Sequence, residues 1–298
     1  MENLTQDGSM NPIEILADPA ISDVLVNSDQ PICIEKDGQL IETNQRFDSE
    51  QSARDYTRAL IQAHDSRIDL AKPFAEINIQ TEFGLVRVHA LLGGECSNGT
   101  QLSIRRHPAN FLTLNDLAKQ GFLEDNQVEI LKTVVSSRKN FVVVGSTGSG
   151  KTTLLRAMLM EAVSERLVII EDSSELRVPK AVSLYSRYSN HEGFGEIDLA
   201  ELARQALRMR PDRLIIGEAR GNEIAVLLQA LNTGHSGAGF TLHANGISET
   251  VPRLLTLLAQ QGIQPGLGRM MIASGIQVAI EVVKQPTRKV TKIESLVI

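Results

Sequence analysis

The sequence lacks any long apolar run, and it contains no tryptophan and only two cysteines. No stretch approaches the ~18 consecutive apolar residues of a membrane-spanning helix, so we expect none. The N-terminal residues are polar and lack the basic start and apolar stretch of a signal peptide, which predicts a cytoplasmic protein. Cys33 and Cys96 lie far apart and form no C-x-x-C pair. They are therefore predicted to be reduced thiols rather than metal ligands.

Positive charge and aromatic side chains are also scarce. The formal net charge is −6, and aromatic residues make up 4% of the chain. A protein that coats nucleic acid needs a basic surface and rings on which bases stack, so we expect no direct nucleic-acid binding. The apolar fraction of 42% is ordinary for a globular protein, and a length of 298 residues favours two domains.

The two parts of the chain differ in pattern. Residues 11–106 mix short strands with an amphipathic helix at Ser52–Ala63, which predicts a small α+β domain. The segment His107–Asn110 interrupts this pattern. We therefore expect an N-terminal domain over residues 1–108 and a second domain over 109–298.

Beyond the break, with 109–125 as a linker region, apolar strands alternate with helices. This alternation predicts a parallel sheet with helices on both faces. A closing hairpin is expected around Gln285-Pro286. The expected strands are Phe141–Val144, Leu167–Ile170, Leu214–Ile216, Phe240–Leu242, Val278–Val283 and Val290–Val297, and the expected helices include Asp198–Met209 and Asn222–Leu231.

The segment Gly145–Thr152 has the phosphate-loop pattern G-x-x-x-x-G-K-T, between an apolar strand and a helical run. Its glycines allow backbone N–H groups to face phosphates, and the helix N-terminus adds positive partial charge. Lys151 is expected to reach the β- and γ-phosphates, and the Thr152 hydroxyl to bind Mg²⁺. A chance glycine-rich turn rarely has this spacing and context. The predicted nucleotide-binding residues are Gly145, Ser146, Thr147, Gly148, Ser149, Gly150, Lys151, Thr152 and Thr153.

Carboxylates follow two later apolar strands. Glu171, Asp172 and Glu175 come at the end of one strand, and Glu218 comes at the end of another. Ligands bind at this edge of parallel sheets. Hydrolysis needs one carboxylate to orient or deprotonate water and others to hold Mg²⁺, partly through water. An acidic cluster that caps a helix N-terminus has the same composition and remains an equal alternative for the first group.

Further polar residues extend this pattern. His243 ends a short strand, where it is placed to hydrogen-bond a γ-phosphate or a carboxylate, although a histidine at a strand end usually has a structural role. Arg220 follows Glu218 and is expected to pair with a carboxylate or to reach a neighbouring subunit, with a surface salt bridge as the alternative. His243 and His235 do not make a metal site without a third ligand.

Four motifs together resemble the type II/type IV secretion ATPase superfamily. They match its Walker A motif, aspartate box, Walker B motif and histidine box, in the family's order and approximate spacing. The absence of C-x-x-C pairs and of a retraction-motor motif favours the conjugal-transfer (TrbB-like) and Tad-pilus (CpaF-like) branch, as do the forms of Arg208–Asp212 and Asn232–His235. The motifs lie at Gly145–Thr152, Ile170–Glu175, Leu207–Gly221 and Thr233–Asn245.

The resemblance implies an α/β fold, with a RecA-like P-loop NTPase domain preceded by a smaller α+β domain. It implies a homo-hexameric ATPase that uses ATP/ADP and Mg²⁺ at the cytoplasmic face of an inner membrane, where it meets secretion or pilus platform proteins. Cargo (DNA, protein or pilin) and direction (assembly or retraction) stay open. Two rivals are a DNA-stimulated RecA-like translocase and a nucleotide-switched scaffold with little hydrolysis.

The same resemblance implies roles for individual residues. Glu175 is the implied general base, and His243 is the implied link between nucleotide state and subunit contacts. Arg87 and Arg105 best match the arginines that reach the phosphates from the N-terminal domain, with solvated strand charges as the alternative. The implied residues around Mg²⁺ are Thr152, Glu171, Asp172 and Glu218.

Overall fold

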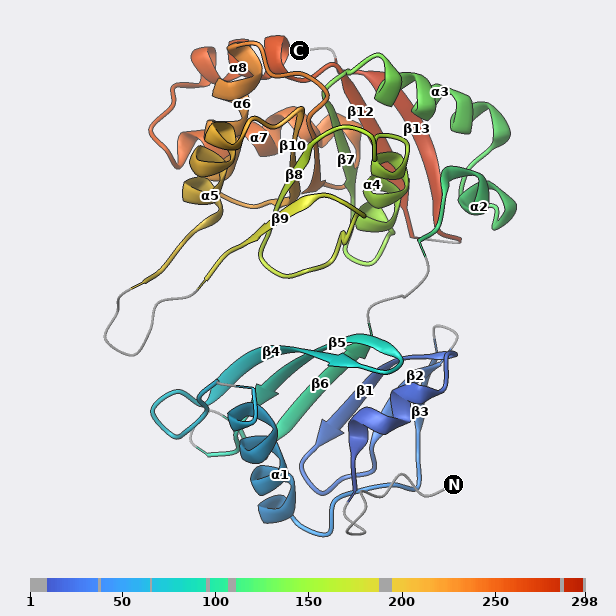
Figure 1. Ribbon diagram of the computed structural model, residues 1–298, viewed down its shortest axis with the longest axis vertical. Coiled ribbons are helices and arrows are strands. Elements are labelled where there is room, and N and C mark those ends of the chain that lie inside the picture. Colours follow the sequence, from blue (N-terminus) through green and yellow to red (C-terminus); the bar gives the residue numbers. More distant parts are fainter. Residues whose placement is uncertain are drawn as a thin grey trace. The chain divides into compact units, whose positions relative to one another are not determined.

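The computed structural model divides the chain into two compact units, Met1–Asn110 and Phe111–Ile298 (Figure 1). The predicted break at His107–Asn110, the thiol of Cys96 and the turn at Gln285-Pro286 fall outside the residues that the structure describes. Those described are 10–36, 39–64, 66–94, 97–106, 111–187, 195–284 and 287–296.

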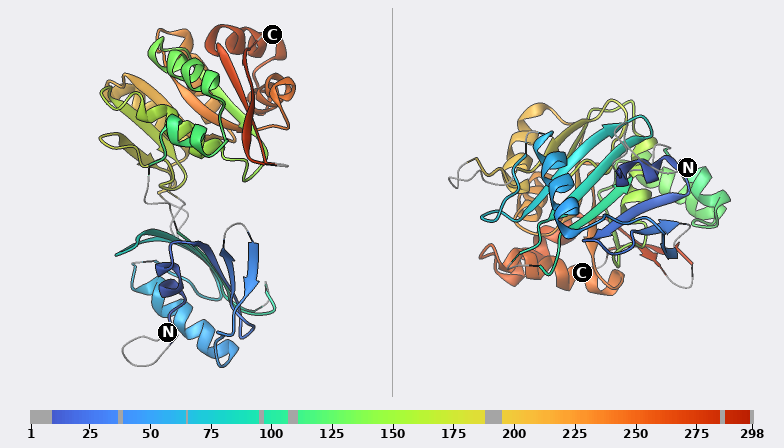
Figure 2. Two further views of the ribbon diagram at one scale, coloured as in Figure 1. Left: turned by 90° about the vertical axis from the view of Figure 1, so that its right-hand side faces the viewer. Right: turned by 90° about the horizontal axis from the view of Figure 1, so that it is seen from below.

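The first unit is built on a six-stranded antiparallel sheet with the order β3-β2-β1-β6-β5-β4. The helix α1 and the 3₁₀ helix η1 pack their apolar residues against one face (Figure 2). The elements are η1 Pro12–Ala17, β1 Ile21–Asn27, β2 Cys33–Lys36, β3 Gln39–Glu42, α1 Glu50–Gln62, β4 Phe74–Thr81, β5 Gly84–Leu91 and β6 Gln101–Arg106.

Apolar and polar side chains alternate along these strands, so that one face of the sheet is buried. In β5, Val86, Val88 and Ala90 point into the core, while the residues between them are half-buried or exposed. The helix α1 begins where the Ser49 hydroxyl accepts the N–H of Ser52, and it turns one apolar side toward the sheet. The predicted helix Ser52–Ala63 is thus confirmed within two residues, and the predicted strands of this region are present.

The second unit contains a seven-stranded sheet with the order β13-β12-β7-β11-β10-β8-β9. All neighbours pair in parallel except β12 and β13, which form an antiparallel hairpin. The strands are β7 Phe141–Gly145, β8 Leu167–Glu171, β9 Val182–Tyr185, β10 Arg213–Ala219, β11 Gly239–His243, β12 Val278–Val283 and β13 Lys289–Ser295.

Helices cover both faces of this sheet, which confirms the predicted α/β class (Figure 1). Within the described residues, three helices pack on one face, and four pack on the other. They are α2 Leu114–Lys119, α3 Asp125–Ser136 and α4 Lys151–Met160 on the first, and α5 Leu199–Ala206, α6 Glu223–Asn232, α7 Thr250–Ala259 and α8 Pro265–Gly275 on the second.

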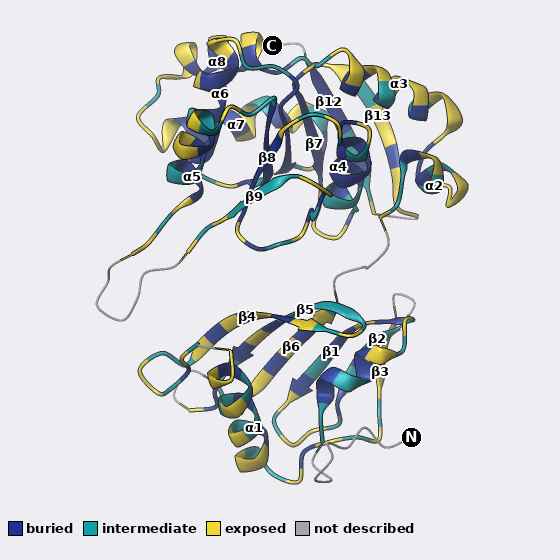
Figure 3. Cartoon of the chain, in the orientation of Figure 1, coloured by how far each residue is buried: buried dark blue, intermediate teal, exposed yellow. Residues whose placement is uncertain are grey.

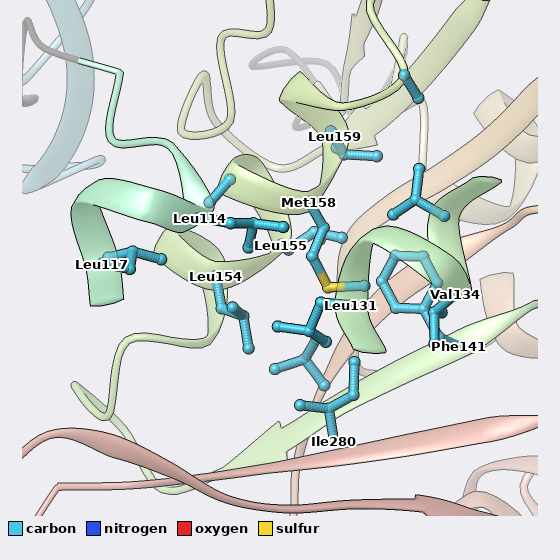
Figure 4. Packing of buried hydrophobic residues seen from close by; sticks show 14 of the residues in the cluster. Leu114, Leu117, Leu131, Val134, Phe141, Leu154, Leu155, Met158, Leu159 and Ile280 are labelled. Carbon is cyan, nitrogen blue, oxygen red and sulfur yellow. The ribbon is translucent and has the colours of Figure 1, made fainter. Parts of the chain in front are cut away.

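The apolar sides of these helices meet the sheet in two closely packed layers. Figure 3 shows the central strands buried along their length, while the helices expose their outer sides. In the layer that contains α4, Leu131 and Met158 pack with Phe141 of β7 and Ile280 of β12 (Figure 4). The predicted linker region includes α2, whose Leu114 and Leu117 are buried in this same layer.

The predicted central strands are all present, with ends that shift by up to three residues. The predicted helix Asp198–Met209 is divided into α5 and a 3₁₀ turn, Leu207–Met209, which ends where Arg210 adopts a left-handed conformation. Helices α7 and α8 are additions that the sequence did not predict. In the described part of the chain, no helix combines the length and apolarity needed to cross a membrane.

Candidate functional site

The phosphate-loop segment connects β7 to α4, and its backbone requires glycine at both ends. Gly145 and Gly150 have φ angles of +158° and +102°, which residues other than glycine rarely adopt. A Cβ on Gly145 would lie 2.2 Å from the Val282 carbonyl oxygen, and one on Gly150 would lie 2.9 Å from the Phe122 ring. Only glycine fits at either position, so the loop keeps an open concave backbone at the N-terminus of a helix. This geometry suits an anion.

Lys151 begins α4 and folds back over the loop. It is 6% exposed, its Nζ donates to the Ser146 carbonyl oxygen at 2.9 Å, and it lies 3.4 Å from Nδ1 of His243. Burial lowers the pKa of its ammonium group, while the charge of Glu218 opposes that shift. The ammonium therefore already occupies the mouth of the loop, in the position from which a lysine contacts bound phosphate.

The carboxylate of Glu218 joins two strands at this edge of the sheet. His243 Nε2, at the end of β11, lies 3.0 Å from Glu218 Oε1, and Arg220 donates to Glu218 Oε2 at 2.6 Å. Burial opposes ionisation of Glu218, but the hydrogen bond and charge of Arg220, together with the charge of Lys151, outweigh it. The pKa of this carboxyl is consequently held below its usual range, so Glu218 is an anion.

These contacts fix the state of His243. Burial lowers the pKa of the imidazole, and the nearby Lys151 ammonium lowers it further. A neutral ring has one donor and one acceptor nitrogen. We infer that Nε2 donates to Glu218 and Nδ1 accepts from Lys151, because an ammonium can only donate and a carboxylate can only accept.

Arg220 extends the set of contacts to the end of β8. Its Nη1 lies 3.5 Å from Asp172 Oδ2, and Asp172 Oδ1 accepts the hydroxyl of Ser186 at 2.8 Å. Glu218 and Asp172 both raise the pKa of the Arg220 guanidinium, Glu218 most strongly. The structure therefore brings together Lys151, His243, Glu218 and Asp172, four of the residues that the sequence predicted.

The remaining two predicted acids of the β8 end differ in their surroundings. Glu175 is exposed, whereas Glu171 is 3% exposed, and burial raises the pKa of its carboxyl to about 7. The backbone N–H groups of Glu175 and Leu176 donate to Oε1 of Glu171 at 3.2 and 2.8 Å. Three neighbouring acids in sequence thus have different environments.

The arginines Arg87 and Arg105 lie in the first unit and are cross-strand partners in the β5–β6 pairing. Both side chains project from the sheet face opposite the buried residues. Arg87 pairs with Glu76 at 2.8 Å, and Arg105 pairs with Asp23 at 2.8 Å. The register therefore gathers two cations and two acids on one surface of the sheet.

Two residues that the sequence analysis did not predict to be site residues also support the site. The Thr241 hydroxyl donates to the Gly217 carbonyl oxygen at 2.6 Å and so joins β11 to β10 beside Glu218. Glu281 of β12 accepts the N–H of Ile247 at 2.9 Å, which holds the segment after His243. Strand pairing creates these contacts, and no local sequence spacing indicates them.

The residues present fit a nucleotide with Mg²⁺. The glycine cradle suits phosphate, and Thr152, Asp172 and Glu218 supply the oxygen atoms that Mg²⁺ prefers. Among the described residues, no group of three histidine, cysteine, aspartate or glutamate side chains could hold a metal ion by itself. Mg²⁺ at nucleotide sites characteristically takes one or two carboxylates together with phosphate oxygens and water.

Comparisons with known proteins agree with this geometry. A family model described as "Type II/IV secretion system protein" matches residues 6–292. A putative conjugal transfer protein of Mycobacterium tuberculosis is 38% identical over 289 residues, which cover 94% of this chain and 81% of that protein. The conjugal transfer protein TrbB of Rhizobium radiobacter is 31% identical over 255 residues, which cover 84% of this chain and 76% of that protein.

Two solved structures share the fold. The pilus retraction motor PilT with bound ADP superposes with a TM-score of 0.69 at 22% identity, covering 97% of this chain and 83% of that chain. The VirB11 ATPase of the Brucella suis type IV secretion system, in complex with sulphate, gives a TM-score of 0.52 at 23% identity, with 95% of each chain covered.

Proposed function

The chain belongs to the type II/IV secretion system protein family, in its TrbB-like branch, and on that premise we propose that it is an ATP-hydrolysing motor. In this proposal it works as a homo-hexamer and powers a type IV secretion, conjugation or Tad/type IV pilus machine. It converts ATP and water to ADP and phosphate. It acts in the cytoplasm, peripherally at the inner membrane, with secretion or pilus platform proteins as its partners.

One observation carries the proposal. Three side chains from α4, β10 and β11 converge at the mouth of a glycine loop: Lys151 lies 3.4 Å from His243, and His243 lies 3.0 Å from Glu218. A cation for the phosphates and an ionised carboxylate beside it are groups that support phosphoryl transfer to water, and the neutral imidazole connects the two. A glycine-rich turn without a role in nucleotide chemistry would not require two buried or half-buried charges here.

The chain's own groups divide the work of the reaction. The phosphate loop, from Gly145 to Thr153, binds the phosphates through its backbone, and Lys151 contacts the β- and γ-phosphates. Glu175 accepts the proton of the water whose oxygen attacks the γ-phosphorus, as the bond to the ADP oxygen breaks. Thr152, Asp172 and Glu218 would hold Mg²⁺, partly through water, and the bound ion would supply positive charge next to the phosphate oxygens.

In this proposal, His243 links the nucleotide state to subunit contacts, and the two arginines assist the chemistry. His243 touches both Lys151 and Glu218, so a phosphate that attracts Lys151 changes what His243 contacts. Arg87 and Arg105 of the N-terminal domain supply positive charge to the transferring phosphate. Each must first exchange its carboxylate partner, Glu76 or Asp23, for the nucleotide. Arginine supplied in this way can raise the rate by about 10³–10⁵.

The proposal is tested by the ATPase rate as a function of protein concentration for the wild type, Lys151→Ala and Arg105→Ala. We expect specific activity to rise with concentration, to vanish in Lys151→Ala and to fall at least about tenfold in Arg105→Ala. The matched control is Arg67→Ala, which removes an exposed arginine of the same unit that pairs locally with Asp69. It should behave like the wild type.

Other outcomes would replace the proposal. A wild type no faster than Lys151→Ala, while still binding ATP, would favour the nucleotide-switched scaffold. Activity that appears only with added DNA would favour a RecA-like translocase. Equal losses in Arg105→Ala and Arg67→Ala would remove the assigned role of Arg105.

A further inference from the structure

The buried carboxylate of Glu171 stands apart from the acids that face the nucleotide site. Its Oε1 accepts two backbone N–H groups, from Glu175 at 3.2 Å and from Leu176 at 2.8 Å. Its Oε2 is buried without a hydrogen-bond partner in the described part of the chain. Burying a carboxylate is costly unless its hydrogen bonds compensate. The two backbone hydrogen bonds therefore compensate part of the free-energy cost of burying this carboxylate.

These two bonds close a loop of the backbone. The chain leaves β8 at Glu171, passes through three residues and returns so that the amides four and five positions along meet one oxygen. Leu176 is fully buried, and Arg177, which follows it, has a left-handed φ of +47°. A non-glycine residue adopts this conformation only where surrounding contacts fix the backbone. The backbone from Glu175 to Arg177 is thus held in one conformation.

Strand β10 limits where the Glu171 side chain can lie. A Cβ on Gly217 would be 2.9 Å from Glu171 Cγ and 3.3 Å from Oε1, so the strand approaches the side chain closely because residue 217 is glycine. The Gly217 carbonyl oxygen in turn accepts the Thr241 hydroxyl. The close approach of β10 therefore limits where the acceptor oxygen of Glu171 can lie, in addition to its bonds with the loop.

Other side-chain hydrogen bonds hold the first half of this loop. Ser186 and Arg220 bind the side chain of Asp172, and the Tyr185 hydroxyl donates to the Ser174 hydroxyl at 3.0 Å. In the second half, where Glu175 lies, the side chain of Glu171 accepts two backbone N–H groups, and Leu176 packs in the core layer that contains α4.

We propose that Glu171 is a positioning residue: its Oε1 anchors the backbone at Glu175 and so directs the Glu175 carboxylate toward the attacking water. The inference rests on the proposed function for the role of Glu175. It assigns to Glu171 the work of a hydrogen-bond acceptor, in place of the Mg²⁺ contact that the sequence predicted. The two roles differ in a testable way, because an acceptor needs an oxygen atom and a metal ligand needs the negative charge.

Two substitutions separate these roles. Glu171→Gln keeps an acceptor oxygen and loses the charge, whereas Glu171→Met keeps the length and loses both. We expect Glu171→Met to lower kcat by about 10- to 100-fold with KM for ATP within about twofold, since misplacement of a reacting group by ~1 Å has effects of this size. Glu171→Gln should stay within about threefold of wild-type kcat. Glu129→Ala, at an exposed position of α3, is the control that should change neither constant.

Hydrogen exchange gives a readout that does not depend on catalysis. The amides of Glu175 and Leu176 should exchange at least about tenfold faster in Glu171→Met than in the wild type or in Glu171→Gln. Glu171→Ala provides a second variant without an acceptor if the methionine variant does not fold.

The outcomes are distinct from those for the proposed function. An inactive wild type that still shows the exchange pattern would refute ATP hydrolysis and leave the anchor in place. Wild-type exchange at both amides in Glu171→Met or Glu171→Ala would overturn the anchor. A Glu171→Gln variant as inactive as Glu171→Met would show that the charge is needed, and would restore the metal role.

Discussion

Replacing Gly239 by alanine is expected to destabilise the second unit by about 1–2 kcal/mol. Gly239 begins β11 and is the cross-strand partner of Phe141 on β7. A Cβ at this position would lie 2.4, 2.8 and 3.0 Å from three carbons of the Phe141 ring. The ring is 1% exposed and belongs to the core layer under α4, so it cannot swing into solvent. Overpacking costs about 1–3 kcal/mol, and losing the freedom of glycine in the unfolded chain offsets about 0.4–1 kcal/mol of this.

A double-mutant cycle tests the cause. In a Phe141→Leu background the ring is absent, so Gly239→Ala should cost at least about 1 kcal/mol less than in the wild type. Urea unfolding followed by far-ultraviolet circular dichroism is the assay, because the chain has no tryptophan. Gly266→Ala, where an added Cβ meets nothing within 4 Å, is the matched control and should not destabilise. The clash argument is refuted if both alanine variants have equal stability, or if the cost at Gly239 is the same in both backgrounds.

Two further predictions concern buried or half-buried charges. Glu165→Ala should cost about 3 kcal/mol in urea unfolding, because Arg213, with a side chain 1% exposed, would lose its carboxylate partner at 2.6 Å. Glu165→Gln keeps an acceptor oxygen for Arg213, so it should lower the free energy of unfolding by less than Glu165→Ala does. Glu50 has a pKa below its usual 4.5, because hydrogen bonds from Ser28 and Thr100 outweigh the effect of burial. Its stabilising contribution is therefore complete above pH 4.5 and is lost as pH falls through the folded pKa. The difference in unfolding free energy between the wild type and Glu50→Gln should shrink over that acid range. If this difference in unfolding free energy grew as the pH fell, the expected direction of the pH dependence would be wrong.

The turn between β7 and α4 was predictable because its backbone conformation depends on local spacing. Gly145, Gly150 and Lys151 are close in sequence, and the left-handed glycines and the start of α4 at Lys151 follow from that spacing. The order of apolar strands and helices likewise determined the α/β class, since a parallel sheet requires crossovers. The doubly covered sheet follows from this pattern.

The environments of Glu171, Asp172 and Glu175 were not predictable from their spacing. Glu171 is buried because β10 passes close to it at Gly217, which is 46 positions away in the sequence. Its two neighbours in the acidic cluster remain exposed. A cluster of acids in a sequence shows that charge is present, but only the strand pairing decides which carboxylate is enclosed.

Helix α8 shows a different limit. Its sequence contains Gly266, Gly268 and Gly275, which weaken any helical prediction from propensity. Gly268 and Gly275 are buried against α7 and α6, where an added Cβ would lie 2.9 Å from Leu255 and 3.0 Å from Leu228. Close packing of α8 against α7 and α6 thus requires glycine at these two positions. The same glycines make α8 hard to predict from the sequence.

The contacts from Lys151 to Asp172 also have a consequence for charge balance. Lys151 and Arg220 contribute two positive charges, Glu218 and Asp172 contribute two negative charges, and His243 is neutral near neutral pH. Before nucleotide arrives, the charges of this group therefore cancel. A polyphosphate brings several negative charges that the group cannot compensate, so tight binding requires cations from elsewhere. Under the proposed function, we therefore expect tight nucleotide binding to depend on Mg²⁺ and on arginines outside this group, such as Arg87 and Arg105.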